Sequence, residues 1–313
     1  KIYDNYEKML VLGSYSRAML HGLLTDSKIS KQNFHYKKQG TLHIYRNKKS
    51  FALALQQAAT PSKFGYHYIV LNKEEILARE PHLQAEQIYA GILFVDDESG
   101  DARLFATELK EHLQKKYAVK FIFNDKVNNI VTENIKVIKF ITNKTENKFD
   151  IFVIACGVDS AELLRQIGHK ITICPVKGYS VELKNITLKS ALTDPLNKIV
   201  YSPLGDKVRA AGVADFYGYD LNIHAQRQKF FMRSILKTFP ATKLEINDAK
   251  IWTGLRPVSK NSLPIISRTK CSNCFVNTAH STLGWTLAAA SGKLLRDLVD
   301  NNKTSINDKY FSL

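Results

Sequence analysis

Lys250-Ile-Trp-Thr-Gly-Leu-Arg256-Pro257 begins the stretch that decides the fold, and Cys274-Phe-Val-Asn-Thr-Ala-His280 and Ser281-Thr-Leu-Gly-Trp-Thr286 continue it. The first two runs are apolar and predict strands, the first of which delivers an arginine to a proline stop. Helically spaced leucines and three successive alanines then predict a helix that ends near Asp300, with Ser281 or Thr282 as its cap. A strand, a loop and a helix N-terminus in this order aim backbone N–H groups and a positive dipole end at an anion, or at a group that becomes negative.

The same stretch resembles a known signature. Three segments, Trp252–Pro257, Leu263–Thr269 and Asn277–Thr286, are similar to the C-terminal signature of the FAD-dependent D-amino-acid oxidase superfamily, and within it most closely to the bacterial D-amino acid dehydrogenase small subunits. The resemblance continues upstream, in chain order, through Gln39–Leu42, Asp97–Asp101, Val119–Phe123 and Pro175–Ser180. It therefore covers nearly the whole chain.

Composition sets the broad class of the protein. With 313 residues, of which 44% are hydrophobic, the chain can bury a core of one or two domains. The net charge of +16 comes from scattered lysines, which favours a solvated basic surface over a nucleic-acid interface. No apolar run approaches the roughly 18 residues of a membrane span, and no signal peptide opens the chain. We therefore expect a cytoplasmic protein. Peripheral attachment to the inner face of the membrane stays open, because the family that the chain resembles passes electrons to the respiratory chain.

The four cysteines predict neither a disulfide framework nor a metal site. Cys156 and Cys174 lie in apolar, strand-like surroundings that are typical of buried thiols. Cys271 and Cys274 have C-x-x-C spacing, but no second ligand pair matches it, and the pair precedes a strand and not a helix.

Two architectures alternate along the chain. The run Phe149–Gly157 is almost continuously apolar and closes on glycine, as strands of parallel sheets do, whereas the regions around it read as antiparallel strands with flanking helices. We therefore predict a mixed α/β and α+β fold with two discontinuous domains. The FAD-binding, Rossmann-like domain takes residues 1–30, 99–175 and 249–300 and is incomplete at its N-terminus, the antiparallel-sheet substrate domain takes 31–98 and 176–248, and 301–313 form a tail.

The resemblance implies FAD as cofactor and assigns residues to it. It implies that Arg256 grips the substrate carboxylate, as a guanidinium fork can, and that His280 lies at the substrate or flavin. Hydride transfer to a flavin needs no strong side-chain base if the amine enters unprotonated, so we assign no catalytic acid or base. The residues that the resemblance implies for the cofactor form a loop against the flavin, a turn at the end of a strand and a contact to the adenine: Thr282, Leu283, Gly284, Trp285 and Thr286, then Ala155 and Gly157, then Val127.

The chain departs from the family pattern at its glycines. The family opens with a G-x-G-x-x-G turn that holds the pyrophosphate, but none of the 15 glycines here stands two residues from another. The first residue is Lys1 and not methionine, so we expect an N-terminal piece to be absent. Ala279, Ser281 and Ala211 stand where the family usually carries glycine, so side chains here would crowd the flavin or strain the turn.

Three functions follow from these observations. The first is oxidative deamination of a D-amino acid to a 2-oxo acid and ammonia by hydride transfer to FAD, with electrons passed to a respiratory acceptor. The second is a related glycine or sarcosine oxidase. The third is a non-catalytic remnant or a split subunit, whose partner chain supplies the missing nucleotide-binding segment. A nucleic-acid binder is a distant further alternative that would show salt-sensitive affinity.

Overall fold

The computed structural model describes residues 2–240 and 250–313. They divide into two compact units. Unit 1 comprises residues 1–28, 112–176 and 255–313, and unit 2 comprises residues 29–111 and 177–254. The border expected between residues 248 and 249 lies outside the described residues.

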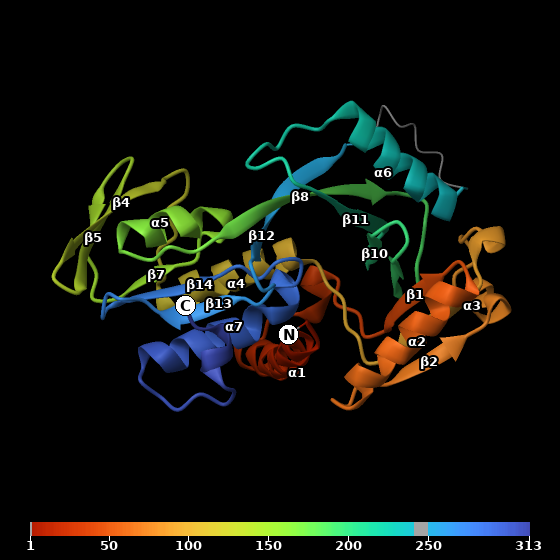
Figure 1. The fold of residues 1–313 in the computed structure, drawn as a ribbon, viewed down its shortest axis with the longest axis horizontal. Helices are drawn as coiled ribbons and strands as arrows, with labels where there is room; N and C mark the ends of the chain where they lie inside the picture. The colour runs from red at the N-terminus through yellow and green to blue at the C-terminus, as the bar shows by residue number, and fades with distance from the viewer. Residues whose placement is uncertain (1, 241–249) are drawn as a thin grey trace. The chain divides into compact units, whose positions relative to one another are not determined.

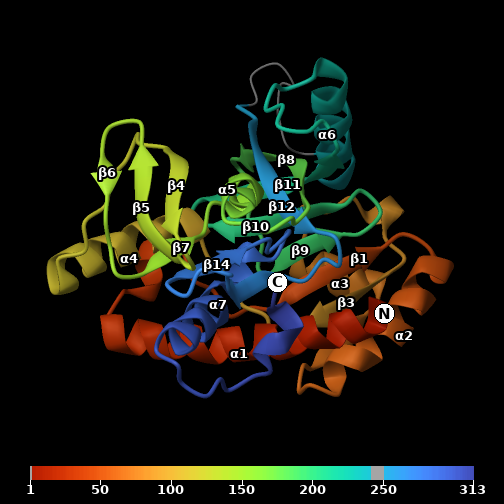
Figure 2. The same cartoon turned by 60° about the vertical axis from the view of Figure 1, so that its left-hand side comes forward.

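Unit 1 is built from helices and two small sheets. Its helices are α1 (Ile2–Ser27), the end of α4 (Ala102–Tyr117), α5 (Ser160–Gln166) and α7 (Gly284–Val299), with short turns η3 (Gly157–Asp159) and η4 (Asp308–Phe311). Among the described residues, one sheet has the order β13 (Ile265–Arg268), β14 (Cys274–Thr278), β7 (Phe152–Ile154). The other has the order β4 (Val127–Glu133), β5 (Lys136–Thr142), β6 (Glu146–Asn147), and Figure 2 shows it as a separate ribbon.

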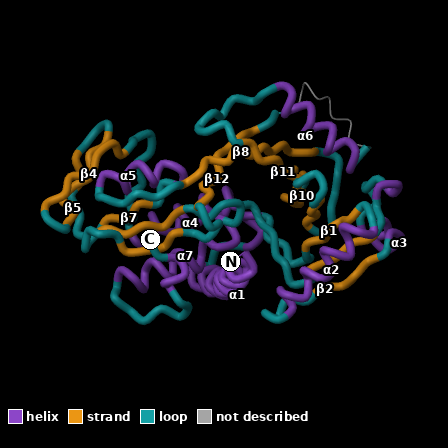
Figure 3. Tube along the Cα trace, in the orientation of Figure 1, coloured by secondary structure: helices purple, strands orange, loops and turns teal. Residues whose placement is uncertain are grey.

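Apolar clusters cover both faces of the β13–β14–β7 sheet. On one face, Val276 of β14 and Ile154 of β7 pack with Leu163 and Leu164 of α5. On the other face, Phe275 packs with leucines of α1 and α7, the two helices that Figure 3 draws side by side in purple. Neighbouring residues of β14 thus point into different clusters, as the period of two in a strand requires. Phe311, in the stretch expected as a tail, is buried in the second cluster.

Unit 2 is organised around one large sheet. The sheet order is β12 (Trp252–Ser259), β8 (Ile173–Leu183), β11 (Lys207–Asp215), β10 (Ile199–Leu204), β9 (Ala191–Asp194), β1 (Thr41–Tyr45), β3 (Ala90–Phe94), β2 (Tyr68–Leu71). Strand β11 pairs antiparallel with β8 and with β10, and β10 pairs antiparallel with β9. Strand β1 pairs parallel with β9, and β3 pairs antiparallel with both β1 and β2. Its remaining helices and turns are η1 (Lys31–Phe34), α2 (Lys48–Ser62), α3 (Lys73–Arg79), η2 (Ala85–Gln87) and α6 (Ala225–Thr238). Strands β8 and β12 each continue from one unit into the other along the chain.

The core of unit 2 lies between this sheet and α6. Phe231, Met232 and Ile235 of α6 are fully buried against Tyr179 and Val181 of β8 and further residues of the same cluster. Figure 1 shows α6 lying beside β8, β11 and β10. The helix is amphipathic, so its opposite face remains in solvent.

Two local predictions are wrong, and both depend on strand neighbours. Residues 119–123, expected as a strand, form no strand, and Ile122 and Phe123 are 64% and 63% exposed. A short apolar run needs a paired neighbour to satisfy its backbone, and no described strand pairs with this one. Pro257 does not stop its strand, because β12 continues to Ser259. This strand stands at the edge of the sheet order, where proline is tolerated.

Candidate active site

The parallel strands of unit 1 end at a common edge. Strand β14 runs parallel to β7, with Val276 opposite Ile154, so the residues that follow both strands leave the sheet on the same side. Ala155 and Gly157 follow β7, and the loop from Ala279 to Leu283 follows β14. Ligand sites of α/β proteins lie beyond the carboxyl ends of such strands. The structure thus brings together two of the three segments predicted to bind the cofactor.

A short hydrogen-bond chain fastens these two segments together. The Cys156 amide donates to Ser160 Oγ (3.0 Å), which lies 3.0 Å from Thr278 Oγ1, and Thr278 Oγ1 is 2.9 Å from the carbonyl oxygen of Gly157. Ser160 and Thr278 are both buried. Gly157 has φ +58°, and no atom lies within 4 Å of where its Cβ would be, so backbone is open to a ligand here. Sequence reasoning missed Ser160, although a serine at a helix start is a recognisable capping signal.

The loop after β14 contains two residues in the left-handed region. Ala279 has φ +63° and Ser281 has φ +53°. Glycine adopts this conformation freely, whereas a side chain there costs about 1–2 kcal/mol. The expectation of strain at these positions therefore has a geometric basis. The strained turn is held by the Ser281 amide, which donates to the Pro257 carbonyl (3.0 Å), and by a bridge between Val258 and His280.

Helix α7 begins without a side-chain cap. Its N-cap residue is Leu283, which makes no side-chain cap hydrogen bond, so the prediction of a Ser281 or Thr282 cap is wrong. The positive end of a 16-residue helix, with the backbone of Gly284 and Thr286 in its first turn, is therefore available to an external acceptor.

His280 lies next to this helix N-terminus, and Arg256 precedes the residue that is bonded to the loop. Arg256 directly precedes Pro257, whose carbonyl holds the loop, and burial lowers the pKa of its guanidinium. A half-buried guanidinium gains most from an anionic partner that replaces the lost water. His280 Nε2 lies 2.9 Å from the Ser291 hydroxyl of α7, and burial lowers the pKa of His280 to about 4. His280 is therefore neutral at neutral pH and fixed to the helix by one ring nitrogen.

Among the described residues, no hydrogen bond joins Val127 to the turn after β7 or to the loop after β14. Val127 is the first residue of β4, pairs with Thr142 of β5, and packs against the α5 side of the sheet. By contrast, Asn277 on β14 has a buried side-chain oxygen without a hydrogen-bond partner among the described residues. Buried polar atoms are seldom left unpaired, so this oxygen is a further candidate for a ligand contact that sequence reasoning missed.

The residues present fit the ring end of a flavin but not its pyrophosphate. The α7 N-terminus, which has no side-chain cap, suits a polar ring that accumulates negative charge, and the open backbone at Gly157 leaves room for it. The Asn277 oxygen, which is unpaired among the described residues, suits an N–H group of such a ring. The G-x-G-x-x-G turn for the pyrophosphate is absent from the 313-residue sequence.

Other site types have little support in the described part of the chain. No group of three or more His, Cys, Asp or Glu side chains there could hold a metal ion. Cys271 and Cys274 are buried, and burial raises the pKa of Cys274 to about 11. The prediction that Cys156 and Cys174 are buried thiols is wrong, because Cys156 is exposed and Cys174 is only half-buried. Across residues 2–240 and 250–313, no helix is long and apolar enough to cross a membrane.

The fold and this site define a class of protein: a flavin-dependent oxidoreductase of mixed α/β and α+β architecture. The model of the family described as DAO, FAD dependent oxidoreductase, matches residues 2–298. The chain therefore belongs to this family of FAD-dependent enzymes, and the resemblance, the mixed α/β and α+β fold and the cofactor class inferred from sequence are confirmed.

Individual relatives agree with this assignment. The chain is 34% identical to the D-amino acid dehydrogenase of Paramagnetospirillum magneticum over 309 residues, covering 97% of this chain and 72% of that protein. It is 32% identical to the D-amino acid dehydrogenase of Granulibacter bethesdensis, covering 97% of this chain and 73% of that protein. Among solved structures, glycine oxidase from Geobacillus kaustophilus superposes with a TM-score of 0.85 at 19% identity, covering 96% of this chain and 82% of that one. L-Proline dehydrogenase from P. horikoshii superposes with a TM-score of 0.83 at 19% identity, covering 96% and 81% of the two chains.

Proposed function

We propose that the protein oxidatively deaminates D-amino acids to 2-oxo acids and ammonia, and that its electrons pass to a respiratory acceptor. The observation that carries the proposal is the position of Arg256, one residue before the carbonyl that holds the α7 loop. A carboxylate bound by this guanidinium would lie beside the uncapped helix N-terminus. The names of the relatives, D-amino acid dehydrogenases, support the substrate class.

Arg256 orients the substrate in this scheme. Two parallel N–H···O bonds from its guanidinium fix the plane of the carboxylate, and with it the direction of the α-hydrogen. The bound FAD supplies the hydride acceptor. The α-carbon gives up its hydrogen with the bonding pair, the amine lone pair forms the C=N bond, and water hydrolyses the imine to the 2-oxo acid and ammonia.

The protein groups around the flavin act mainly by electrostatics. The first-turn amides at Gly284 and Thr286 stabilise negative charge at the end of the helix. Thr282 and Leu283 of the preceding loop and Trp285 of the first helical turn border the same end of α7. His280, with its pKa of about 4, is not protonated at neutral pH, so it contributes a neutral contact. Because the amine lone pair forms the C=N bond, the amine reacts in its unprotonated form.

A nucleotide-binding segment from outside residues 1–313 would complete the cofactor site. Phe152 of β7 donates its amide to Asn273 O (2.8 Å), so the backbone of Val153 faces the opposite edge, where the sheet order of the described strands ends. Val153 is 40% exposed and Ile151 46%. An exposed apolar edge of a parallel sheet accepts a further strand readily. We propose that this strand comes with the missing pyrophosphate-binding turn, in the same polypeptide or in a partner chain, and that Ala155, Gly157 and Val127 then border the nucleotide.

A titration with FAD, followed by anaerobic addition of D-alanine or L-alanine, tests this function. The visible spectrum of the flavin should shift on binding, and the bound flavin should bleach with D-alanine alone. We expect Arg256→Lys to raise the KM for D-alanine about 10- to 100-fold, because one charge-assisted hydrogen bond is lost, while the exposed Arg165→Lys leaves it unchanged.

Three outcomes would contradict the proposal in different ways. Equal bleaching by both isomers would exclude D-specificity. Turnover of glycine or sarcosine in preference to D-alanine would establish the oxidase-like alternative, which the glycine oxidase fold likeness keeps open. Absence of flavin binding would show that the chain by itself is a remnant or a split subunit.

A further inference from the structure

A loop of unit 2 exposes an unusual number of apolar side chains. Residues 216–223, termed here the apolar loop, connect β11 to α6. Their five large apolar residues are between 42% and 75% exposed: Phe216, Tyr217, Tyr219, Leu221 and Ile223. A soluble surface seldom gathers so many large apolar groups in eight residues without a binding role.

The apolar loop is held in place by a buried cation. Lys177 is completely buried, and its Nζ lies 3.0 Å from Asp220 Oδ2 and 2.8 Å from the Asn222 carbonyl. The Asn222 amide donates to Asp220 Oδ1 (2.9 Å), and His224 lies 2.7 Å from the same carboxylate. The Asp220 carboxylate and the Asn222 carbonyl therefore point toward this lysine, and the Tyr217 ring also lies against it, with its centroid 5.0 Å from Nζ. Phe216, which is 75% exposed, and Leu221, which is 51% exposed, remain open to solvent.

The helix that follows the loop presents a basic face. Lys229, Arg233 and Lys237 are spaced by four residues, are exposed, and form no ion pair within the described residues. They line a shallow hollow of about 450 Å³ together with Asn197, Gln226, Phe230 and Ser234. Like charges at this spacing repel one another, and α6 contains no acidic residue that would compensate. Phe230, which is 47% exposed, stands among these cations.

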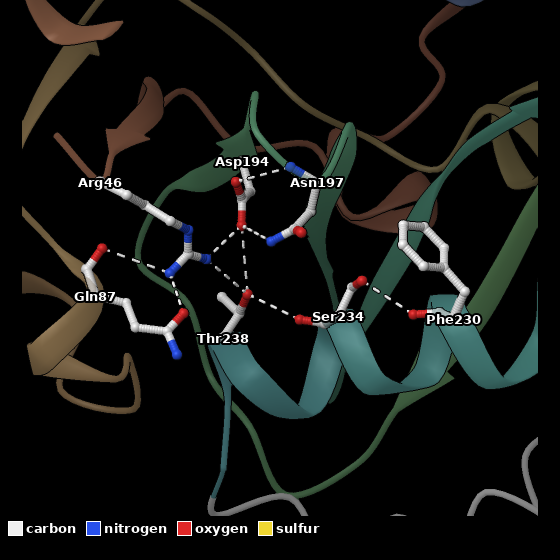
Figure 4. Close-up of polar contacts among 7 residues, drawn as sticks. All are labelled: Arg46, Gln87, Asp194, Asn197, Phe230, Ser234 and Thr238. Atoms are coloured by element: carbon white, nitrogen blue, oxygen red, sulfur yellow. Dashed lines mark hydrogen bonds and ion pairs between the residues drawn. The ribbon is translucent and has the colours of Figure 1, made fainter. Parts of the chain in front are cut away.

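The opposite face of α6 is fixed to the body of unit 2. Figure 4 shows the Arg46 guanidinium between Gln87 and Asp194, with Thr238 of α6 bonded to the same guanidinium. The Arg46–Asp194 pair is buried, with a 2.5 Å separation, and Thr238 lies 3.2 Å from Arg46. Figures 1 and 2 both show the apolar loop beside the N-terminal end of this helix. These buried contacts therefore fix the position of α6, which carries the basic face and follows the loop.

We propose that the apolar loop and the basic face of α6 form a surface that docks onto an anionic lipid bilayer. Lysines and arginines attract acidic headgroups, and aromatic and aliphatic tips enter the interface between headgroups and acyl chains. Leu221 and Ile223 favour a bilayer over single-stranded nucleic acid, which is bound by stacking on aromatic rings. The inference rests on the proposed delivery of electrons to a membrane acceptor and names the surface that would bring the enzyme there.

Vesicle sedimentation with the chain of residues 1–313 tests this surface without flavin or substrate. The protein should bind vesicles of phosphatidylcholine with 30% phosphatidylglycerol and bind pure phosphatidylcholine far more weakly. The triple variant Lys229→Gln, Arg233→Gln, Lys237→Gln should reduce partitioning about a hundredfold, since each cation near an anionic surface contributes close to a factor of five. The matched variant Lys48→Gln, Lys49→Gln, Lys63→Gln removes equal charge from exposed sites of the same unit and should leave most binding intact.

The apolar contribution is tested separately. Phe216→Ser with Leu221→Ser, both at exposed positions, should weaken binding at a salt concentration where the charge contribution is screened. Equal losses of vesicle binding in the two triple variants would show that only net charge matters. That result would overturn the proposal. Salt-sensitive binding to single-stranded RNA with no binding to vesicles would overturn it in favour of a nucleic acid. Loss of self-association in the Phe216→Ser, Leu221→Ser variant, again without vesicle binding, would identify a second copy as the occupant.

Discussion

The left-handed turn at Ala279 makes a prediction that a matched variant can isolate. Ala279 and Ala290 both belong to unit 1 and both have 0% exposure, but Ala279 has φ +63° whereas Ala290 lies within α7. Replacing each by glycine removes the same buried methyl group. The two variants therefore differ mainly in how glycine changes the conformational free energy of the backbone at each position.

The magnitudes follow from the local geometry. Each variant loses about 0.8 kcal/mol of apolar burial. At Ala279, glycine removes about 1–2 kcal/mol of left-handed strain, so Ala279→Gly should be between neutral and about 1 kcal/mol more stable. At Ala290, glycine costs a further ~1 kcal/mol in the helix, so Ala290→Gly should lose about 2 kcal/mol. The two variants should differ by about 2–3 kcal/mol.

Urea unfolding, followed by circular dichroism and by tryptophan fluorescence, measures this difference. Coincident transitions by the two probes would justify a two-state treatment of unit 1. If Ala279→Gly is destabilised as much as Ala290→Gly, the turn carries no strain and the reasoning about this loop is wrong.

Two further predictions concern buried ionisable groups. Burial lowers the pKa of His280 to about 4 from 6.5, so its contribution is complete above pH 6.5 and is lost as the pH falls towards 4. Between pH 7 and pH 5 the wild-type should therefore lose about 2 kcal/mol more unfolding free energy than His280→Gln, and parallel pH profiles would refute this. Glu80, 1% exposed, accepts the amides of Lys189 (3.0 Å) and Ser190 (2.9 Å). Glu80→Ala should cost about 2–4 kcal/mol in urea unfolding, against less than about 0.5 for the exposed Glu74→Ala, and a cost equal to that control would contradict the role of Glu80.

The sequence predicted the elements whose pattern is local. Helix α7 was predicted from its leucine spacing and alanines, and the parallel strand β7 from its unbroken apolar run, because periodicity and burial on both faces are written directly in the residues. The family also followed from sequence, because its signature extends through consecutive segments of the chain.

Predictions that needed a neighbour failed or could not be made. Residues 119–123 have the composition of a strand, yet a strand exists only where another pairs with it. The cap of α7 was misassigned because the φ of Ser281 is set by the bond between its own amide and the distant Pro257 carbonyl. The link from Ser160 to Thr278 joins residues 118 positions apart, which no sequence window covers.

By itself, then, the sequence determined the family, the mixed fold, the FAD cofactor and the candidate arginine at 256. Only the tertiary structure decided that His280 lies beside the N-terminus of α7, that the Pro257 carbonyl holds the preceding loop, and that Lys177 binds Asp220 and the Asn222 carbonyl of the 216–223 loop. The physical reason is the range of the interactions. Periodicity and turn chemistry act between residues a few positions apart, whereas left-handed turns, buried ion pairs and open sheet edges depend on groups that only the fold brings together.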